Sequence, residues 1–464
     1  MHNSPHLTRR HALGLLGATL LTGCAMGGGG SGAPASKAPT GKVSAGNPFG
    51  VPDSGKVELA YFKGGTPNYL AETVEPLLQK RFPNIKIQRT MSERLSQTLQ
   101  PRFVGGSPPD FVDNAGADAL NFGALIQDGQ VLDLTAFYDA PSIDDPSKKI
   151  KDSLLPGAYE STLVDGVPYT VSFVARSFGL WYNAKLGLEA PTTWEAFIKV
   201  CEELKKSGIT PFGYAGKNAA DYQAEAILTS AVKIGGLELV RAIDNLEDGA
   251  WQAEAVKQAA EAWAEIGARF SDKSFEGLIH TEVQLRQNQG KVAFYPSGDW
   301  LESEQQKTTP KDFEYTMMPT PSITSSDKLP AAAVYALLGS SMFATAKGQN
   351  PAVAQEFMRL MVSKAGARAY TQASGWLTTV PGAADGLELS PGTLVSQRAL
   401  AAAGEAKALI TWKWNGWYQP LLTEIRDATN ALMYGRATAA EFTERMQKKA
   451  DEVKADPAVK KYQR

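Results

Sequence analysis

Short apolar segments alternate with helix-like segments over residues 57–113. The apolar segments are rich in the branched and aromatic residues that favour strands, and they comprise residues 57–62, 85–87 and 110–113. Residues 70–82 and 92–103 lie between them and have the length of helices, the first of them ending at Pro83. Parallel strands cannot be joined by a short hairpin and need a longer crossover, which is usually a helix. A strand–helix–strand order therefore predicts parallel pairing. The expected fold class is therefore α/β.

The segments that follow the predicted strands are candidate ligand contacts. Ligands of open α/β sheets gather at the carboxyl ends of the strands. Residues 63–66 and 114–118 occupy such positions here. Plain turns without a ligand role are the alternative interpretation of both segments.

The first 24 residues have the pattern of an export signal. Arg9 and Arg10 precede an apolar run, residues 12–21, and the box Leu21-Thr22-Gly23-Cys24 closes the segment. We expect cleavage after residue 23 and lipid attachment to Cys24, and the paired arginines suggest the twin-arginine route. An uncleaved membrane anchor is the alternative, but such a helix needs about 20 apolar residues. The pattern predicts a protein held outside the cytoplasm by its lipid.

A tether and a large folded part follow this signal. Residues 24–55 are rich in Gly, Ser, Ala and Pro without an apolar period, so we expect a flexible linker there. The remainder is roughly 400 residues long, which is more than one hydrophobic core usually serves. Two lobes are expected.

The composition excludes several classes of function. Three of the four histidines lie in the export signal, which leaves His280 for a catalytic triad or a metal site. Cys201 has no disulfide partner once Cys24 is lipidated. We expect it to lie on a helix over 194–207 with its side chain in the protein core. Loss of Arg9 and Arg10 changes the formal net charge from −2 to −4, which argues against nucleic acid as a partner. No metal or other cofactor is expected.

Tryptophans are concentrated in one short segment. Residues 411–418 read Thr-Trp-Lys-Trp-Asn-Gly-Trp-Tyr, and further tryptophans, Trp300 and Trp376, each follow closely after a glycine. Sugar sites combine flat aromatic surfaces with a few fixed polar groups, which these residue types supply. A buried strand and loop is the alternative for 411–418. By contrast, Trp251 and Trp263 fall at helical spacing and are expected in the core.

A resemblance to a known family rests on several short motifs. Gly290-Lys291-Val292-Ala293-Phe294 followed by Gly298-Asp299-Trp300 resembles a hallmark of the extracellular solute-binding proteins of carbohydrate ABC transporters. Further motifs fit the same family in the same order: Pro109-Asp110, Trp181-Tyr182-Asn183 and Pro191-Thr192-Thr193-Trp194-Glu195. The runs 100–114 and 139–146 resemble the branch that binds N-acetylglucosamine and chitobiose.

This resemblance implies a periplasmic-binding-protein-like fold with two lobes, a hinge and a ligand cleft. The implied N-lobe comprises residues 56–172 and 330–385, and the implied C-lobe comprises 173–329 and 386–464. It further implies capture of a mono- or oligosaccharide without catalysis, and delivery to the membrane permease of an ABC transporter. We expect a monomer.

The resemblance also implies the sugar contacts. They are expected from Lys63, Asn114 and Asp118 in the first lobe, from Arg176 at the crossing, and from Tyr222, Asp299, Trp300, Trp417 and Tyr418 in the second, with Trp376 and Trp412 as further candidates. Trp300 and Trp417 would stack on sugar rings. The polar residues Asp299, Asp118, Arg176 and Asn114 would bind hydroxyl or acetamido groups.

Two other classes of protein stay open. An exported glycoside hydrolase also uses tryptophan surfaces and needs two carboxylates, for which Asp299 with Glu302 or Glu304 is conceivable. These carboxylates lie within one short segment, however, and no independent partner is evident. An adhesion or structural lipoprotein would bind no small ligand.

Overall fold

The structure is a computed structural model that describes residues 41–64, 67–116 and 118–464. The predicted export signal, the lipidation site Cys24 and tether residues 24–40 lie outside the described residues.

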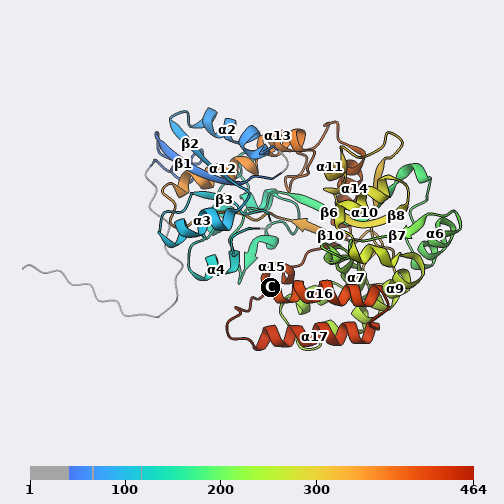
Figure 1. The fold of residues 1–464 in the computed structure, drawn as a ribbon. Helices are drawn as coiled ribbons and strands as arrows, with labels where there is room; N and C mark the ends of the chain where they lie inside the picture. Colours follow the sequence, from blue (N-terminus) through green and yellow to red (C-terminus); the bar gives the residue numbers. More distant parts are fainter. Residues whose placement is uncertain (1–40, 65–66, 117) are drawn as a thin grey trace, which may run out of the picture. The chain divides into compact units, whose positions relative to one another are not determined.

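The N-lobe is built on a four-stranded sheet of the described residues in the order β11-β3-β1-β2 (Figure 1). Strands β1, β2 and β3 run parallel, with Leu59 of β1 opposite Arg89 and Phe111. The predicted parallel pairing is thus confirmed. The elements of this lobe are β1 (Gly55–Phe62), α1 (Tyr69–Thr73), α2 (Glu75–Arg81), β2 (Ile85–Ser92), α3 (Leu95–Val104), β3 (Phe111–Asp113), α4 (Phe122–Gln127), α5 (Thr135–Asp139), β4 (Leu163–Val164), β5 (Val167–Pro168), β11 (Met342–Ala344), α12 (Pro351–Met361) and α13 (Lys364–Ser374).

The last part of the predicted tether packs against the N-lobe. Phe49 is 8% exposed and Val51 is 2% exposed, and both pack in the N-lobe core, where the ring of Phe49 stacks on that of Phe137 at 6.1 Å. Burying two apolar side chains stabilises this segment against the lobe. The prediction of a free linker up to residue 55 is therefore wrong for its last part.

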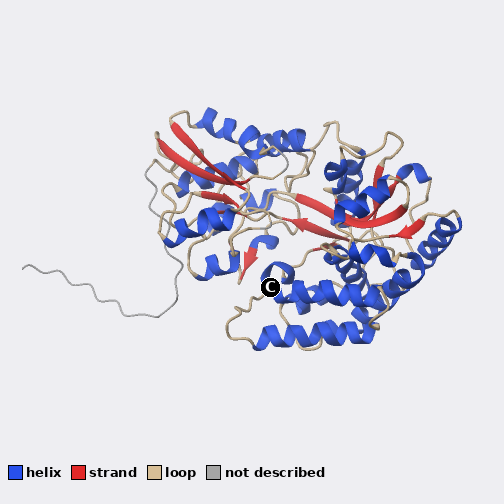
Figure 2. Ribbon diagram, in the orientation of Figure 1, coloured by secondary structure: helices blue, strands red, loops and turns tan. Residues whose placement is uncertain are grey.

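The C-lobe contains a larger mixed sheet, ordered β12-β10-β6-β8-β7, with β9 also pairing with β6. Its elements are β6 (Ala175–Asn183), α6 (Trp194–Lys206), β7 (Thr210–Phe212), α7 (Ala220–Gly235), α8 (Glu238–Asp244), α9 (Glu254–Phe270), α10 (His280–Asn288), β8 (Val292–Gly298), α11 (Leu301–Gln305), β9 (Tyr315–Met318), β10 (Val334–Leu338), α14 (Pro391–Glu405), β12 (Leu409–Ile410), α15 (Trp414–Trp417), α16 (Gln419–Met433) and α17 (Ala439–Ala455). Helices flank these strands and form the lower layer of the lobe in Figure 2.

The C-lobe core contains the residues that periodicity assigned to it. Trp251, Trp263 and Cys201 are all fully buried, which confirms the core prediction. The indole N–H of Trp263 donates to the Ser230 hydroxyl at 3.0 Å, so its polar atom is satisfied within the core. Burial raises the pKa of the Cys201 thiol to about 12, which makes this cysteine unreactive.

Extended segments connect the two lobes. The chain passes from N-lobe to C-lobe between β5 and β6, returns between β10 and β11, and passes again between α13 and α14. Strand β10 pairs with β6 in the C-lobe sheet, with Leu337 opposite Arg176. Strand Val334–Leu338 therefore belongs to the C-lobe sheet, although the sequence prediction began the N-lobe segment at residue 330.

Among the described residues, no helix combines the length and the apolar character that crossing a membrane requires.

Candidate functional site

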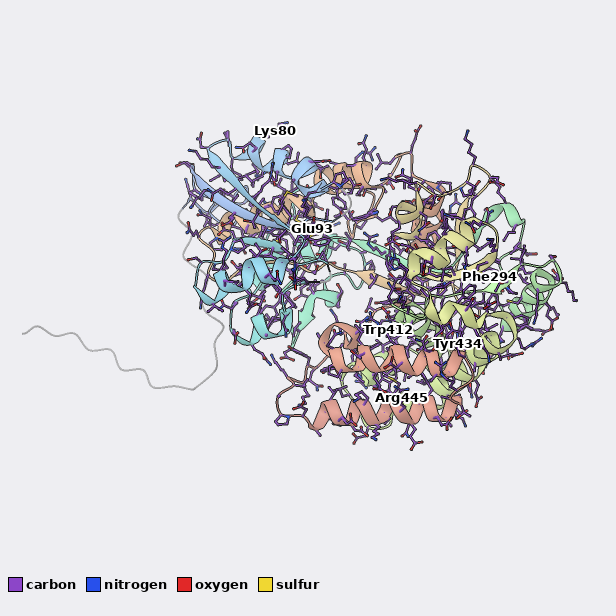
Figure 3. The ribbon with its side chains drawn as sticks, viewed as in Figure 1. Lys80, Glu93, Phe294, Trp412, Tyr434 and Arg445 are labelled. Carbon is purple, nitrogen blue, oxygen red and sulfur yellow. The ribbon has the colours of Figure 1, made fainter. Side chains whose placement is uncertain are left out.

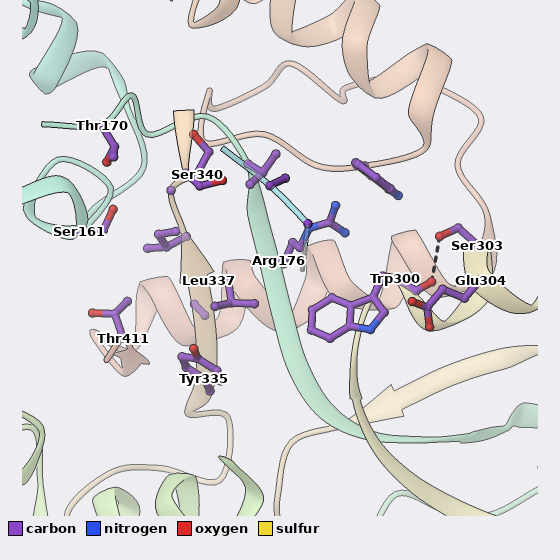
Figure 4. A pocket seen from close by; sticks show the side chains of 18 of the residues that line it. Ser161, Thr170, Arg176, Trp300, Ser303, Glu304, Tyr335, Leu337, Ser340 and Thr411 are labelled. Atoms are coloured by element: carbon purple, nitrogen blue, oxygen red, sulfur yellow. Dashed lines mark hydrogen bonds between the residues drawn. The ribbon is translucent and has the colours of Figure 1, made fainter. Parts of the chain in front are cut away.

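A cleft of about 1410 Å³ lies where the two lobes meet, and Figure 4 shows it from close by. The N-lobe side is lined by Pro67, Tyr69, Ala115, Gly116, Ser161, Thr170, Gly339, Ser340, Ser341 and Trp376, with Val174 at the crossing. The C-lobe side is lined by Arg176, Tyr222, Trp300, Ser303, Glu304, Gln306, Lys307, Tyr335, Ala336, Leu337, Leu338, Thr411, Trp412 and Lys413. Aromatic rings and hydroxyl groups thus come from both lobes, whereas the amide and charged side chains of the lining come from the C-lobe side.

Trp300 is held by its position between β8 and α11. Gly298 ends β8, and any Cβ at this position would overlap the Trp300 ring. The indole lies against Tyr222 at 5.6 Å and Phe178 at 6.3 Å, so one side of the ring is fixed by aromatic packing. Trp300 lines the cleft, and its contact with a ligand stays a prediction.

Arg176 stands at the centre of the cleft floor, on the strand that leaves the hinge (Figure 4). Its guanidinium carbon lies 4.1 Å from the ring centre of Trp376 and 6.0 Å from that of Trp300. The cation therefore stacks on indoles from both lobes, an arrangement favoured by the negative face of each ring. Its side chain is 13% exposed.

Asp299 forms an ion pair with Arg176. The Asp299 carboxylate accepts from Arg176 Nη1 at 3.1 Å and from the Ser396 hydroxyl at 2.9 Å. Burial raises the pKa of Asp299, while Arg176 and Ser396 counteract that rise by stabilising the ionised form. Asp299 does not line the cleft, so in this arrangement it orients Arg176.

The aromatic residues of the segment 411–418 differ in their surroundings: some are buried in the core and one lines the cleft. Trp412 lines the cleft, with its ring 5.5 Å from that of Tyr335. Trp414 is 1% exposed and packs on Trp251, so it belongs to the core. Trp417 and Tyr418 lie outside the cleft lining, where they pack against Tyr462.

The predicted N-lobe contacts are placed beside the cleft and engage other partners. Both amide atoms of Asn114 bond the backbone of Leu120, at 2.8 and 3.0 Å. Asp118 accepts from the Gln97 backbone N–H at 3.3 Å, and Lys63 lies 3.5 Å from the Glu93 carboxylate. None of these three lines the cleft described here. Ala115 and Gly116, which follow Asn114, line the cleft instead.

Sequence reasoning missed several polar residues of the lining. Tyr335 lies in an apolar run that looks like a buried strand, and Tyr69 looks like an ordinary helix start. Ser161 lies in a short 3₁₀ helix over Glu160–Thr162, and Thr170 and Ser340 lie in irregular segments. None of the three belongs to a motif. Thr170 and Ser340 lie next to crossings between the lobes, a signal that becomes visible only with the fold.

A buried carboxyl group lies behind the Tyr335 side of the cleft. Glu225 of α7 accepts from the Asn415 amide at 3.2 Å, and the same amide lies 3.5 Å from the Tyr335 hydroxyl. Burial raises the pKa of Glu225 to about 8, with a further upward contribution from Asp221, while Trp412 and Asn415 lower it. Glu225 is therefore mostly protonated at neutral pH and can act as a hydrogen-bond donor.

Sequence comparison identifies the family of this chain. The family model described as bacterial extracellular solute-binding protein matches residues 64–368. The diacetylchitobiose binding protein NgcE of Streptomyces coelicolor is 31% identical over 433 residues, which cover 91% of this chain and 90% of the relative. This chain belongs to the bacterial extracellular solute-binding protein family.

Two solved structures share the fold of this chain. A chitin oligosaccharide binding protein has a TM-score of 0.66 and 21% identity, covering 87% of this chain and all of its own. The apo-form of RafE from Streptococcus pneumoniae has a TM-score of 0.67 and 18% identity, covering 86% of this chain and 98% of its own. The two-lobe α/β fold expected from the sequence is therefore confirmed.

Membership of the solute-binding protein family places this protein outside the cytoplasm. Within the part of the chain that the structure describes, no three His, Cys, Asp or Glu side chains are grouped so that they could hold a metal ion. The cleft lining offers aromatic surfaces, hydrogen-bonding groups and several charged side chains, with Arg176 at the centre.

Proposed function

We propose that this solute-binding protein captures an N-acetylated sugar, N-acetylglucosamine or diacetylchitobiose, in the cleft and delivers it to an ABC permease. The observation that carries the proposal is the arrangement of aromatic rings around Arg176, with Trp300 on one lobe and Trp376 on the other. Pyranose rings present apolar C–H faces to such indoles and hydroxyl groups to the polar rim.

The choice of sugar is supported by the relative NgcE, which is named for diacetylchitobiose and is similar over nearly the whole chain. An acetamido group offers one donor and one acceptor. Arg176, Ser340 and Tyr335 supply complementary donors along the cleft, and the hydroxyls also accept. A sugar without the acetamido group leaves such groups unpaired, at about 1–3 kcal/mol for each buried group.

Sugar capture is tested by isothermal titration of the compact unit Ser36–Arg464 with N-acetylglucosamine, diacetylchitobiose, maltose and cellobiose. Binding of the N-acetylated sugars at least roughly tenfold tighter than of the other two supports the proposal. If only maltose or cellobiose binds, the protein still captures sugar, and the proposed specificity for the acetamido group is wrong. Absence of heat from all four sugars would contradict sugar capture in this form.

The hydrolase alternative finds no support in the positions of its carboxylates. Asp299 is paired with Arg176, Glu302 accepts from the Ser390 hydroxyl, and Glu304 accepts from Gln284 at 3.1 Å. A glycosidase needs two carboxyl groups placed across a scissile bond. Incubation with chitin oligomers is expected to release no reducing sugar.

We further propose that the protein is a monomer held to the membrane by lipid on Cys24. Two or more acyl chains anchor stably because each buried methylene contributes about 0.8 kcal/mol. In cells, Cys24→Ser is expected to abolish palmitate labelling and release the protein from the membrane fraction. Retention of the label in the Cys24→Ser variant would contradict this assignment. Light scattering of the soluble unit tests the monomer.

A further inference from the structure

Residues 456–464 follow α17 of the C-lobe and run back toward the cleft. In Figure 1 this segment leaves α17 and ends beside α15. It is irregular, yet Tyr462 within it is only 4% exposed, which means that this ring is packed on several sides. Its partners come from both lobes.

The contacts to the N-lobe involve the β4–β5 hairpin and α4. Lys460 Nζ lies 3.1 Å from Asp165 Oδ2, and the backbone N–H of Gln463 donates to Asp165 Oδ1 at 3.2 Å. Asp165 stands at the hairpin turn with φ 52°. The Tyr462 hydroxyl reaches α4, where a Cβ added to Gly123 would lie 2.7 Å from it.

The aromatic contacts to the C-lobe centre on the same tyrosine. The Tyr462 ring lies 5.2 Å from the Trp417 ring, and its backbone N–H donates to the Tyr418 hydroxyl at 3.0 Å. Tyr462 is thus wedged between α15 and α4, and it joins the cores of the two lobes.

The polar contacts to the C-lobe reach the cleft wall. Arg464 donates to Asp244 Oδ2 at 2.7 Å and to Thr411 Oγ1 at 2.6 Å. The other oxygen of Asp244 accepts the backbone N–H groups of Lys413 and Trp414, both at 2.9 Å. Arg464 and Asp244 therefore fix the backbone on both sides of Trp412.

We propose that residues 456–464 form an interlobe strap that links the β4–β5 hairpin of the N-lobe to the 411–414 wall of the C-lobe and positions Trp412 for ligand. Both ends of the strap act next to the cleft, since Thr411, Trp412 and Lys413 line one side and Ser161 and Thr170 flank the hairpin on the other. The link between the lobes stands without any ligand. The positioning of Trp412 rests on the proposed sugar capture.

The interlobe part is tested without sugar by measuring the distance between spin labels on the two lobes. Lys80 and Lys206 are exposed on α2 and α6, and Figure 3 shows Lys80 at the outer edge of the N-lobe. They are replaced by cysteine in the unit Ser36–Arg464, where the buried Cys201 thiol has a raised pKa and stays unlabelled. Distances are compared for the parent and for Tyr462→Ala, Asp165→Lys and Lys460→Asp.

We expect Tyr462→Ala and Asp165→Lys to broaden the distance distribution and shift it to longer values. Combining Asp165→Lys with Lys460→Asp restores opposite charges and is expected to recover much of the parent distribution. Reversal of Arg436 and Glu276, an exposed pair within the C-lobe, is the matched control and is expected to leave it unchanged. Unchanged distances in both Tyr462→Ala and Asp165→Lys, in proteins with native circular dichroism, would overturn the strap.

The positioning part is tested by sugar titration of Arg464→Ala and Arg464→Lys, alone and combined with Trp412→Ala. We expect Arg464→Ala to weaken binding about tenfold and Arg464→Lys to weaken it less. In the Trp412→Ala background, Arg464→Ala is expected to have little further effect, because both changes remove the same contact. Fully additive losses would refute the positioning role. If no variant or parent binds sugar, the proposed function fails while the label distances still decide the strap.

Discussion

Arg176 lies at the centre of the cleft and contacts indoles from both lobes. Lysine at this position would keep the charge and lose the flat surface that stacks on Trp376 at 4.1 Å. A stacked cation contributes about 0.5–2 kcal/mol, so Arg176→Lys is expected to weaken sugar binding roughly twofold to thirtyfold with an unchanged fold. Titration calorimetry measures this effect. Arg436→Lys, outside the cleft, is the control, and equal affinities for the parent and Arg176→Lys would contradict a role for stacking.

Trp300 offers a second test at the residue scale. Removing the ring in Trp300→Ala is expected to weaken sugar binding roughly tenfold or more, because a platform of this size is lost. Trp300→Phe keeps a smaller platform and is expected to lose less. Circular dichroism checks the fold of both variants. Affinity within twofold of the parent for a folded Trp300→Ala protein would remove Trp300 from the site.

Glu225 makes stability depend on pH. Its pKa of about 8 in the folded protein lies above its ordinary value, so the folded state binds more protons than the unfolded state between about pH 4.5 and 8. The free energy of unfolding therefore falls as pH rises through this window. Glutamine at position 225 does not titrate, so the Glu225→Gln variant does not lose this contribution. Between pH 5 and pH 8 the free energy of unfolding of the parent is expected to fall by about 2–4 kcal/mol relative to that of the variant. Urea unfolding at both pH values measures it, and parallel pH profiles would contradict the protonated state.

At the scale of elements, Gly267 allows helices α9 and α16 to pack closely. Gly267 of α9 faces the end of α16, and a Cβ there would overlap the backbone of Met433. Gly404 of α14 has room, since a Cβ would lie 3.8 Å from Leu409 Cδ1. Intrinsic helix propensity favours alanine at both positions by up to about 1 kcal/mol.

Gly267→Ala is nevertheless expected to destabilise the protein by about 2 kcal/mol or more, because the backbone of α16 must shift. Gly404→Ala is expected to be neutral or to stabilise by up to about 1 kcal/mol. Thermal unfolding of the two variants compares them directly. A stabilised Gly267→Ala protein would show that α16 moves away without cost.

At the scale of the whole molecule, the size of the cleft predicts movement. Its volume of about 1410 Å³ exceeds the roughly 300–1,000 Å³ typical of sites that enclose a small ligand. A sugar that contacts both lobes therefore favours a more closed arrangement. Small-angle scattering of the unit Ser36–Arg464 is expected to give a smaller radius of gyration with the bound sugar. An identical radius with saturating sugar would indicate a rigid cleft.

The sequence predicted the alternation, the parallel strands and the buried Trp251 and Trp263, because these depend on local periodicity. It could not separate Trp412 from Trp414, which are two residues apart and have similar neighbours. That difference arises from Asp244, which fixes the loop from a distant helix through backbone hydrogen bonds. Ser161 and Thr170 were likewise invisible, since only the crossing of the chain between lobes brings them to the cleft.

The indoles around Arg176 also give the protein a built-in optical signal. Trp376 and Trp300 belong to different lobes and share one guanidinium between them. Indole emission responds to the charge and water around the ring, so any rotation of the lobes changes the surroundings of both fluorophores at once. The same three side chains that we propose hold a ligand thereby allow its arrival to be followed by light, without any added dye.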